Sequence, residues 1–271
     1  MEFNSPFDCI LFDLDDTLYS SNVGIAQACK RNIEGFLASK FGVSAERSAS
    51  LRIELFQSYG SSLAGLIALG YDIHPDEYHG FVHWTLPYEW IKPDPQLQEL
   101  LNTIQQPKII FTNADRKHAK RVLERLGIDE ECFDGMVCFE TLNPHLFEEK
   151  SSSSSSSSSS SVPSPDVILK PSMAAMAAAV RVAGADPRRT LFLDDSERNI
   201  AAGKAFGLRT CLVGKRVKIK EADYLLESIS SLRIVIPGIW GELEVEEEKK
   251  EHEMVRRNEL GSIRAAAQVE A

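Results

Sequence analysis

Short apolar runs alternate with helical patterns along most of this 271-residue sequence. Five of the runs are typical of buried strands and cover residues 9–12, 109–111, 136–139, 191–193 and 210–213. Between them, residues 115–126 and 173–182 place apolar side chains at helical spacing. This alternation predicts an α/β fold, in which helices cover a mostly parallel, Rossmann-like sheet.

A long helical stretch separates the first predicted strand from the second. Apolar side chains recur at helical spacing over residues 25–41, and further helices are expected over 48–59 and 76–84. Pro87, Pro93 and Pro95 then mark a stiff return to the sheet. We therefore expect an all-helical insertion over residues 20–92 and an α/β core built from residues 7–19 and 93–238.

Two segments lack the composition of a packed core. Residues 151–161 are an unbroken serine run. Because this run has no apolar surface to offset the entropy of ordering, residues 146–165 are expected to form a disordered linker within the core. A tract for regulatory phosphorylation is the alternative. Residues 241–271 are rich in Glu, Lys and Arg, which predicts a solvated helix or a disordered extension.

The formal charge of −10 opposes non-specific binding to nucleic acid or to anionic lipid. The sequence shows no basic and apolar leader at its N-terminus, and no apolar run long enough to span a bilayer. We therefore expect no nucleic-acid or membrane partner, and a location in the cytoplasm or also in the nucleus. Protein partners are left open by the sequence.

Polar and charged side chains stand where four of the apolar runs end. They are Asp13 and Asp15, Thr112 and Asn113, Lys170 after the run at 167–169, and Asp194 and Asp195. Because the carboxyl ends of parallel strands face one crevice, we expect these side chains to converge. Four such strand ends in one chain favour a functional site over coincidence.

The residue types suit a phosphate group and a hard cation. The Thr112 hydroxyl, with N–H groups near the start of a helix, suits phosphate oxygens. The adjacent carboxylates of Asp194 and Asp195 would repel each other unless a cation lay between them. Taken singly, each residue has a structural alternative, such as helix capping by Asn113 or an exposed position for Lys170.

The four motifs in this order resemble those of the haloacid dehalogenase superfamily of hydrolases. The resemblance covers residues 7–227, interrupted by the serine-rich segment. Within the superfamily the chain is similar to the pyrimidine 5′-nucleotidase group. The segments that carry this likeness are residues 12–19, 59–66, 86–88, 92–95 and 192–196.

The resemblance implies a phosphomonoester hydrolase with an aspartyl-phosphate intermediate. Asp13 would be the nucleophile, and Asp15 would protonate the leaving group and later deprotonate the attacking water. Mg²⁺ would be the cofactor, held by Asp13, the backbone carbonyl of Asp15, and Asp194 or Asp195. The residues implied to hold the transferred phosphoryl group are Thr112, Asn113 and Lys170.

The same resemblance implies a small-molecule substrate under a helical lid, with nucleoside 5′-monophosphates, and pyrimidines first, as the expected class. Three aromatic side chains are candidates for stacking on a nucleobase, with core packing as the alternative. They are Tyr19, Tyr59 and Trp84. A phosphatase of sugar phosphates or other small metabolites is the nearest alternative function. A catalytically silent binding or regulatory protein with the same fold is a more distant one.

Overall fold

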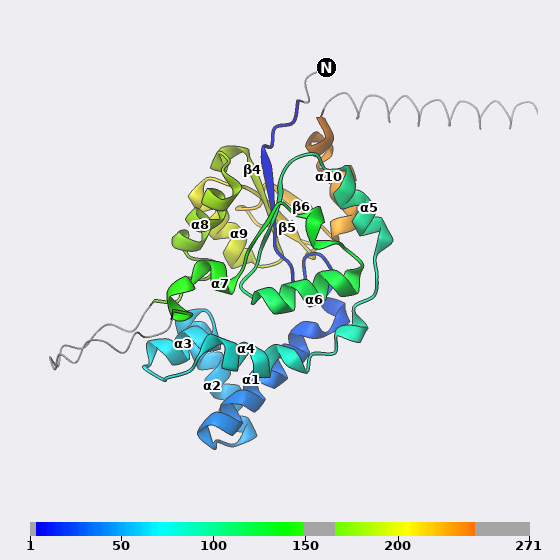
Figure 1. The fold of residues 1–271 in the computed structure, drawn as a ribbon. Coiled ribbons are helices and arrows are strands. Elements are labelled where there is room, and N and C mark those ends of the chain that lie inside the picture. The colour runs from blue at the N-terminus through cyan, green and yellow to red at the C-terminus, as the bar shows by residue number, and fades with distance from the viewer. Residues whose placement is uncertain (1–3, 149–165, 242–271) are drawn as a thin grey trace, which may run out of the picture.

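The computed structural model describes residues 4–148 and 166–241. In these residues six parallel strands form one sheet, in the order β3-β2-β1-β4-β5-β6 (Figure 1). The strands are β1 (Cys9–Phe12), β2 (Lys108–Phe111), β3 (Gly135–Val137), β4 (Thr190–Asp194), β5 (Arg209–Val213) and β6 (Tyr224–Leu226). The predicted α/β fold with a parallel sheet is confirmed. The serine run and residues 242–271 of the charged tail lie outside the described residues.

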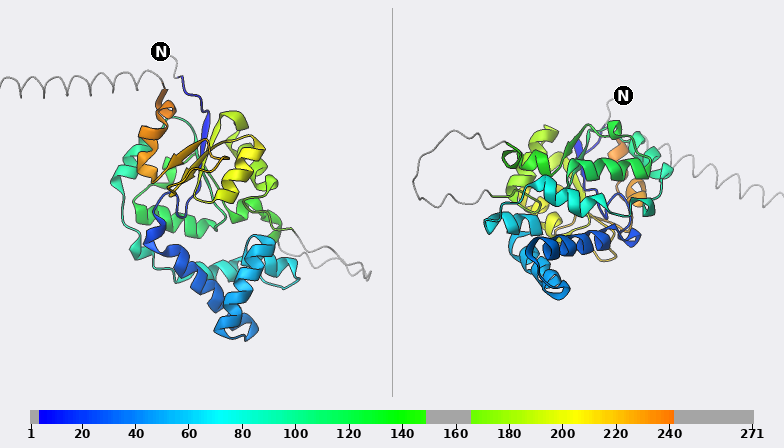
Figure 2. Two further views of the ribbon diagram at one scale, coloured as in Figure 1. Left: turned by 180° about the vertical axis from the view of Figure 1, so that it is seen from behind. Right: turned by 60° about the horizontal axis from the view of Figure 1, so that its bottom comes forward.

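Helices cover both faces of this sheet. α5, α6 and α10 pack on one face, and α8 and α9 pack on the other, as the view from behind in Figure 2 shows. The helices are α1 (Ile25–Phe41), α2 (Ala45–Tyr59), α3 (Ser62–Ala68), α4 (Pro75–Trp84), α5 (Pro95–Thr103), α6 (Arg116–Leu126), α7 (Phe139–Leu142), α8 (Met173–Ala183), α9 (Glu197–Phe206) and α10 (Leu232–Val235). Among the described residues, no helix combines the length and the apolar character needed to cross a bilayer.

The central strand β1 shows why both faces are covered. Its four residues are all buried. Ile10 and Phe12 pack in the hydrophobic cluster that contains α5 and α6, whereas Cys9 and Leu11 pack with α8 and α9. Because successive side chains of a strand point to opposite faces, a strand without polar positions requires an apolar layer on each side.

Three helices start directly after the segments that carry the candidate site residues. The side chain of Asp115 accepts a hydrogen bond from the backbone N–H of His118 and so caps α6. Ser172 caps α8 and Ser196 caps α9 in the same way. The sharp passage from strand or extended chain to helix holds the intervening loops at the carboxyl edge of the sheet.

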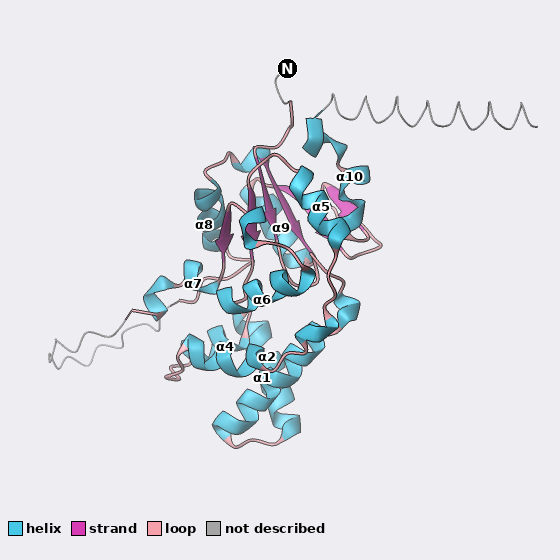
Figure 3. Ribbon diagram, turned by 45° about the vertical axis from the view of Figure 1, so that its right-hand side comes forward, coloured by secondary structure: helices cyan, strands magenta, loops and turns pink. Residues whose placement is uncertain are grey.

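Helices α1 to α4 form a separate layer beyond the end toward which the strands run (Figures 1 and 3). Their buried side chains, including Phe36, Leu63 and Val82, make a hydrophobic cluster of their own. This cluster also contains Phe139 and Leu169, which precede and follow the serine-rich segment. The layer therefore contacts the rest of the protein next to the candidate site. The domain boundaries at residues 20–92 stay a prediction.

The structure corrects one predicted strand. The apolar run at residues 167–169, counted above among the strand ends, has no assigned secondary structure and is not part of the sheet. The side chain of Asn143 replaces a neighbouring strand, because it donates to the carbonyl of Ile168 at 2.9 Å and accepts from its N–H at 2.7 Å. Lys170 nevertheless reaches the carboxyl edge. Strand β6 and helix α3 are additional elements, and both are short.

Candidate active site

The chain turns sharply where β1 ends. Asp16 has a φ of 60°, a left-handed conformation that aspartate adopts more readily than most residues. The backbone N–H of Leu18 then donates to the carbonyl of Leu14 at 3.0 Å. This turn lets the hydroxyl of Thr17 donate to Oδ2 of Asp13 at 2.9 Å. The Asp13 carboxylate is thus oriented from within its own loop, and it is only 7% exposed.

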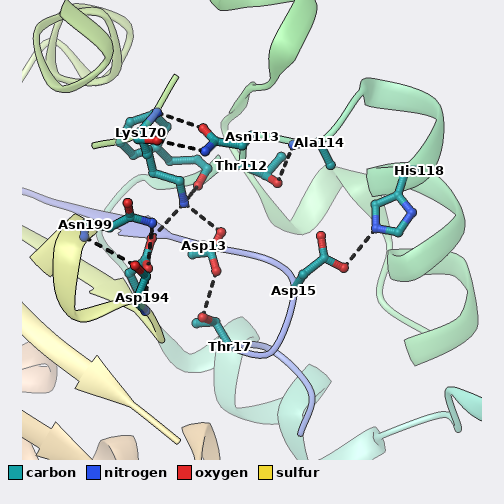
Figure 4. A network of polar contacts seen from close by, with 12 residues as sticks. Asp13, Asp15, Thr17, Thr112, Asn113, Ala114, His118, Lys170, Asp194 and Asn199 are labelled. Atoms are coloured by element: carbon teal, nitrogen blue, oxygen red, sulfur yellow. Dashed lines mark hydrogen bonds and ion pairs between the residues drawn. The ribbon is translucent and has the colours of Figure 1, made fainter. Parts of the chain in front are cut away.

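The ammonium group of Lys170 is the centre of a buried network (Figure 4). It donates to Oδ1 of Asp13 at 2.7 Å, to Oδ2 of Asp194 at 2.7 Å and to the carbonyl of Phe111 at 2.6 Å. These contacts engage all three ammonium protons. The side chain of Asn113 holds the backbone of Lys170, because it accepts from the lysine N–H at 2.8 Å and donates to its carbonyl at 3.0 Å. Lys170 is therefore a buried ion-pair partner, with 3% exposure.

Charge in this network is unevenly balanced. Burial raises the pKa of Asp13 and of Asp194, and the charge of Lys170 offsets only part of that effect. Burial alone would lower the pKa of Lys170, but the two carboxylates together outweigh it and raise the pKa. The ammonium group therefore stays charged, while two buried carboxylates share a single positive partner.

A third carboxylate joins this pair. Asp13, Asp194 and Asp195 each offer an oxygen, and the three oxygens lie within 4.8 Å of one another. Asn199 donates from Nδ2 to both oxygens of Asp194 at 3.0 Å, which fixes that side chain. Burial, and then repulsion from Asp13, raise the pKa of Asp195 to about 6. Clustered carboxylate oxygens with excess negative charge are a donor set that fits a hard divalent cation such as Mg²⁺.

Asp15 lies on the other side of the loop and points away from Lys170 (Figure 4). Its Oδ1 accepts from the hydroxyl of Tyr19 at 2.5 Å and from Nε2 of His118 at 2.9 Å. Burial acts to raise the pKa of Asp15, but His118, the hydrogen bond from Tyr19 and the charge of His83 together more than offset it and lower the pKa. Conversely, burial acts to lower the pKa of His118, but the carboxylates of Asp15 and Asp115 together outweigh it and raise the pKa of that imidazole.

A cavity of about 530 Å³ adjoins these groups. Asp15 and Asn113 line it from the ends of β1 and β2, and His118 lines it from α6. Residues of α1 to α4 line it from the helical layer. The latter include two cations, Lys30 and Arg52, beside apolar side chains. This volume is in the range of pockets that take up small molecules.

The remaining predicted residues take different positions. The hydroxyl of Thr112 is buried next to the site and accepts from the N–H of Ala114 at 3.0 Å. Tyr19 contacts Asp15 and not the cavity surface. Tyr59 is 42% exposed and Trp84 is 75% exposed, and neither is among the described residues that line this cavity. A stacking role for these aromatic side chains stays a prediction.

Sequence reasoning assigned no place in the site to His118, Asn199 or Thr17. One signal for His118 was present. It falls on the same helical face as Val122 and Ala119, which are fully buried. A titratable side chain on an otherwise apolar face needs a polar partner, and here that partner is Asp15.

Residues 7–207 match the family model described as haloacid dehalogenase-like hydrolase. The chain belongs to the haloacid dehalogenase-like hydrolase family. The match covers β1, β2, β3 and β4 with their following loops, so all four segments that carry the candidate site lie within it.

The chain covers a different share of the length of each of two related proteins. It is 26% identical over 206 residues to phosphate metabolism protein 8 of Saccharomyces cerevisiae, which covers 73% of this chain and 58% of the yeast protein. It is 22% identical over 247 residues to the pyrophosphatase PpaX of Halalkalibacterium halodurans, over 87% of this chain and 98% of that protein. The chain thus spans less than two thirds of the yeast relative.

Among solved structures, the fold of this hydrolase is similar to that of a HAD phosphatase from Thermococcus onnurineus. The TM-score is 0.55 at 14% identity, over 84% of this chain and 97% of the other. At this identity the likeness supports the shared fold.

Proposed function

We propose that this hydrolase is a phosphomonoesterase that forms a phospho-enzyme on Asp13. The observation that carries the proposal is the ammonium group of Lys170, which lies 2.7 Å from both Asp13 and Asp194 beside the carboxylate of Asp195. A carboxylate can attack a phosphate dianion only where positive charge compensates both groups. The names of the two relatives, a phosphate metabolism protein and a pyrophosphatase, support phosphate chemistry.

The residues divide the reaction between them. An oxygen of Asp13 attacks phosphorus, and the bond between phosphorus and the ester oxygen breaks. Asp15 gives a proton to the departing alkoxide and then takes one from the water that attacks the aspartyl-phosphate. That attack breaks the bond between phosphorus and Asp13 and releases inorganic phosphate. Thr112 and Asn113 would bind the phosphoryl oxygens while Lys170 keeps its charge beside them.

The carboxylates would hold Mg²⁺, with Asp13, the backbone carbonyl of Asp15 and either Asp194 or Asp195 as ligands. When bound, the ion would offset the negative charge of the phosphate oxygens. We expect EDTA to abolish phosphate release and Mg²⁺ to restore it. Ca²⁺ should substitute poorly, because its coordination is looser and of higher number. Phosphate release assays on the chelated, the Mg²⁺-restored and the Ca²⁺-loaded enzyme test this, and full activity after complete chelation would contradict it.

For the substrate, we propose nucleoside 5′-monophosphates, with pyrimidines first. Comparing kcat/KM for UMP, CMP, AMP and a hexose phosphate at fixed Mg²⁺ tests the preference, because discrimination appears in that ratio. A base in the cavity would contact the helical layer, and those contacts would stabilise the transition state from a distance. A hexose phosphate has no base to make these contacts. Equal efficiency on the hexose phosphate would favour a sugar phosphatase. Absence of phosphate release from every ester would favour a silent binding protein.

A pair of variants sharpens the substrate test. Phe56 lines the cavity from α2 and is half exposed, whereas Tyr59 lies one turn further along and outside the lining. If the base stacks in this cavity, Phe56→Ala should lower kcat/KM for UMP more than for the hexose phosphate. Tyr59→Ala is the matched control, and an equal or larger effect of that variant would show that the base binds elsewhere.

A further inference from the structure

Two donors from different parts of the chain converge on one oxygen of Asp15. The hydroxyl of Tyr19 lies 2.5 Å from Oδ1, and Nε2 of His118 lies 2.9 Å from the same atom. Oδ2 has no hydrogen-bond partner among residues 4–148 and 166–241. The side chain of Asp15 is 35% exposed and lines the cavity. The two donors therefore select one orientation of the carboxyl group and leave one oxygen available.

His118 is itself held firmly. Its ring is buried, with 3% exposure, and Nδ1 shares a hydrogen bond of 2.8 Å with the hydroxyl of Tyr88. The ring of His83 lies against it, at 4.6 Å between centroids. Oδ1 of Asp15 is an acceptor in the ionised carboxylate and also in the acid that carries its proton on Oδ2, so Nε2 carries the proton that faces Asp15. Each ring nitrogen thus has one defined partner, and the imidazole has little freedom to turn.

We infer that His118 is a positioning residue that fixes Asp15 for proton transfer to the leaving group. The inference rests on the proposed phosphomonoesterase function, and it requires no contact between His118 and the reacting atoms. His83 comes from α4 of the helical layer and Tyr88 from the segment that follows α4, whereas His118 comes from α6 on the sheet. The orientation of Asp15 therefore depends on packing between the helical layer and the sheet-bound helix.

Two substitutions distinguish the roles of the two ring nitrogens of His118. His118→Gln can place an amide N–H near the position of Nε2, so it keeps a donor for Asp15. His118→Asn reaches only the position of Nδ1, so it can still bond Tyr88 but loses the donor. His79→Leu is the packing control, because His79 stacks on the ring of His83 and is not among the described residues that hydrogen-bond Asp15.

The test compares kcat/KM for two esters that differ in their leaving group. An alkoxide needs a proton as it departs, whereas p-nitrophenolate does not, and kcat/KM reports the steps up to that departure. The esters are p-nitrophenyl phosphate and an alkyl monophosphate that the wild-type enzyme hydrolyses. For the alkyl ester, His118→Asn should lower kcat/KM about 10- to 100-fold, and for the nitrophenyl ester less than about 3-fold. His118→Gln should stay within about 3-fold of wild type on both, and His79→Leu should leave the ratio of the two esters unchanged.

An equal loss on both esters, or no loss on either, would overturn the inference. If His118→Asn does not fold, Tyr88→Phe replaces it, since loss of the hydroxyl that orients the ring should shift the ester ratio in the same direction. An unchanged ratio in Tyr88→Phe would then overturn the inference. Failure of the proposed function gives a different result, because the wild-type enzyme would then release phosphate from neither ester.

Discussion

Replacing Asp13 with asparagine should lower the rate of phosphate release by about four orders of magnitude or more. An amide is a poor nucleophile and a weak ligand for a hard cation. The fold should persist, because the amide oxygen can still accept from Lys170 and its nitrogen can donate to the hydroxyl of Thr17. Phosphate release at saturating Mg²⁺ and the thermal unfolding temperature are the two measurements.

Asp16→Asn is the matched control for this substitution. Asp16 sits in the same turn, but it lies outside the carboxylate cluster, and asparagine tolerates its left-handed backbone. We expect this variant to keep most of the activity. Wild-type activity in Asp13→Asn, or an equal loss in both variants, would contradict the assignment of the nucleophile.

The fold was predictable because its signals are local. The continuous apolar run of residues 9–12 and the carboxylates that follow it are both visible in one short segment. The rule that parallel strands present their carboxyl ends to one crevice then brings Asp13 and Asp194 together without knowledge of packing. Their placement in one cluster agrees with that rule.

Other features depend on contacts between distant segments. The apolar run before Lys170 has the composition of a strand, but the side chain of Asn143 bonds the backbone of Ile168 in place of a neighbouring strand. The hydrogen bond between Nδ1 of His118 and the hydroxyl of Tyr88 likewise depends on how α6 packs against the turn that carries Tyr88. No periodicity within either segment indicates these pairings, because each depends on a residue 25 to 30 positions away.

Lys170→Met should both inactivate and destabilise the protein. The substitution removes the only charge that the buried carboxylates of Asp13 and Asp194 share among the described ion pairs. Breaking a buried ion pair from one side typically lowers the free energy of unfolding by about 3–5 kcal/mol, because it leaves uncompensated charge. Methionine fits the space, since the rings of Phe111 and Phe192 already flank the lysine at 5.0 and 5.6 Å. The loss of stability should therefore result from the missing charge and not from a change in side-chain shape.

Lys215→Met is the control for the loss of one positive charge near the carboxylates. Lys215 is 41% exposed and lies 3.8 Å from Asp195, so its ion pair is screened by solvent and should contribute about 0–1 kcal/mol. Denaturant unfolding in EDTA compares the two variants without any cation in the carboxylate cluster. If Mg²⁺ binds there, adding it should recover part of the stability of Lys170→Met, because a cation replaces some of the lost charge. Equal destabilisation by the two substitutions would show that Lys170 does not balance the buried carboxylates.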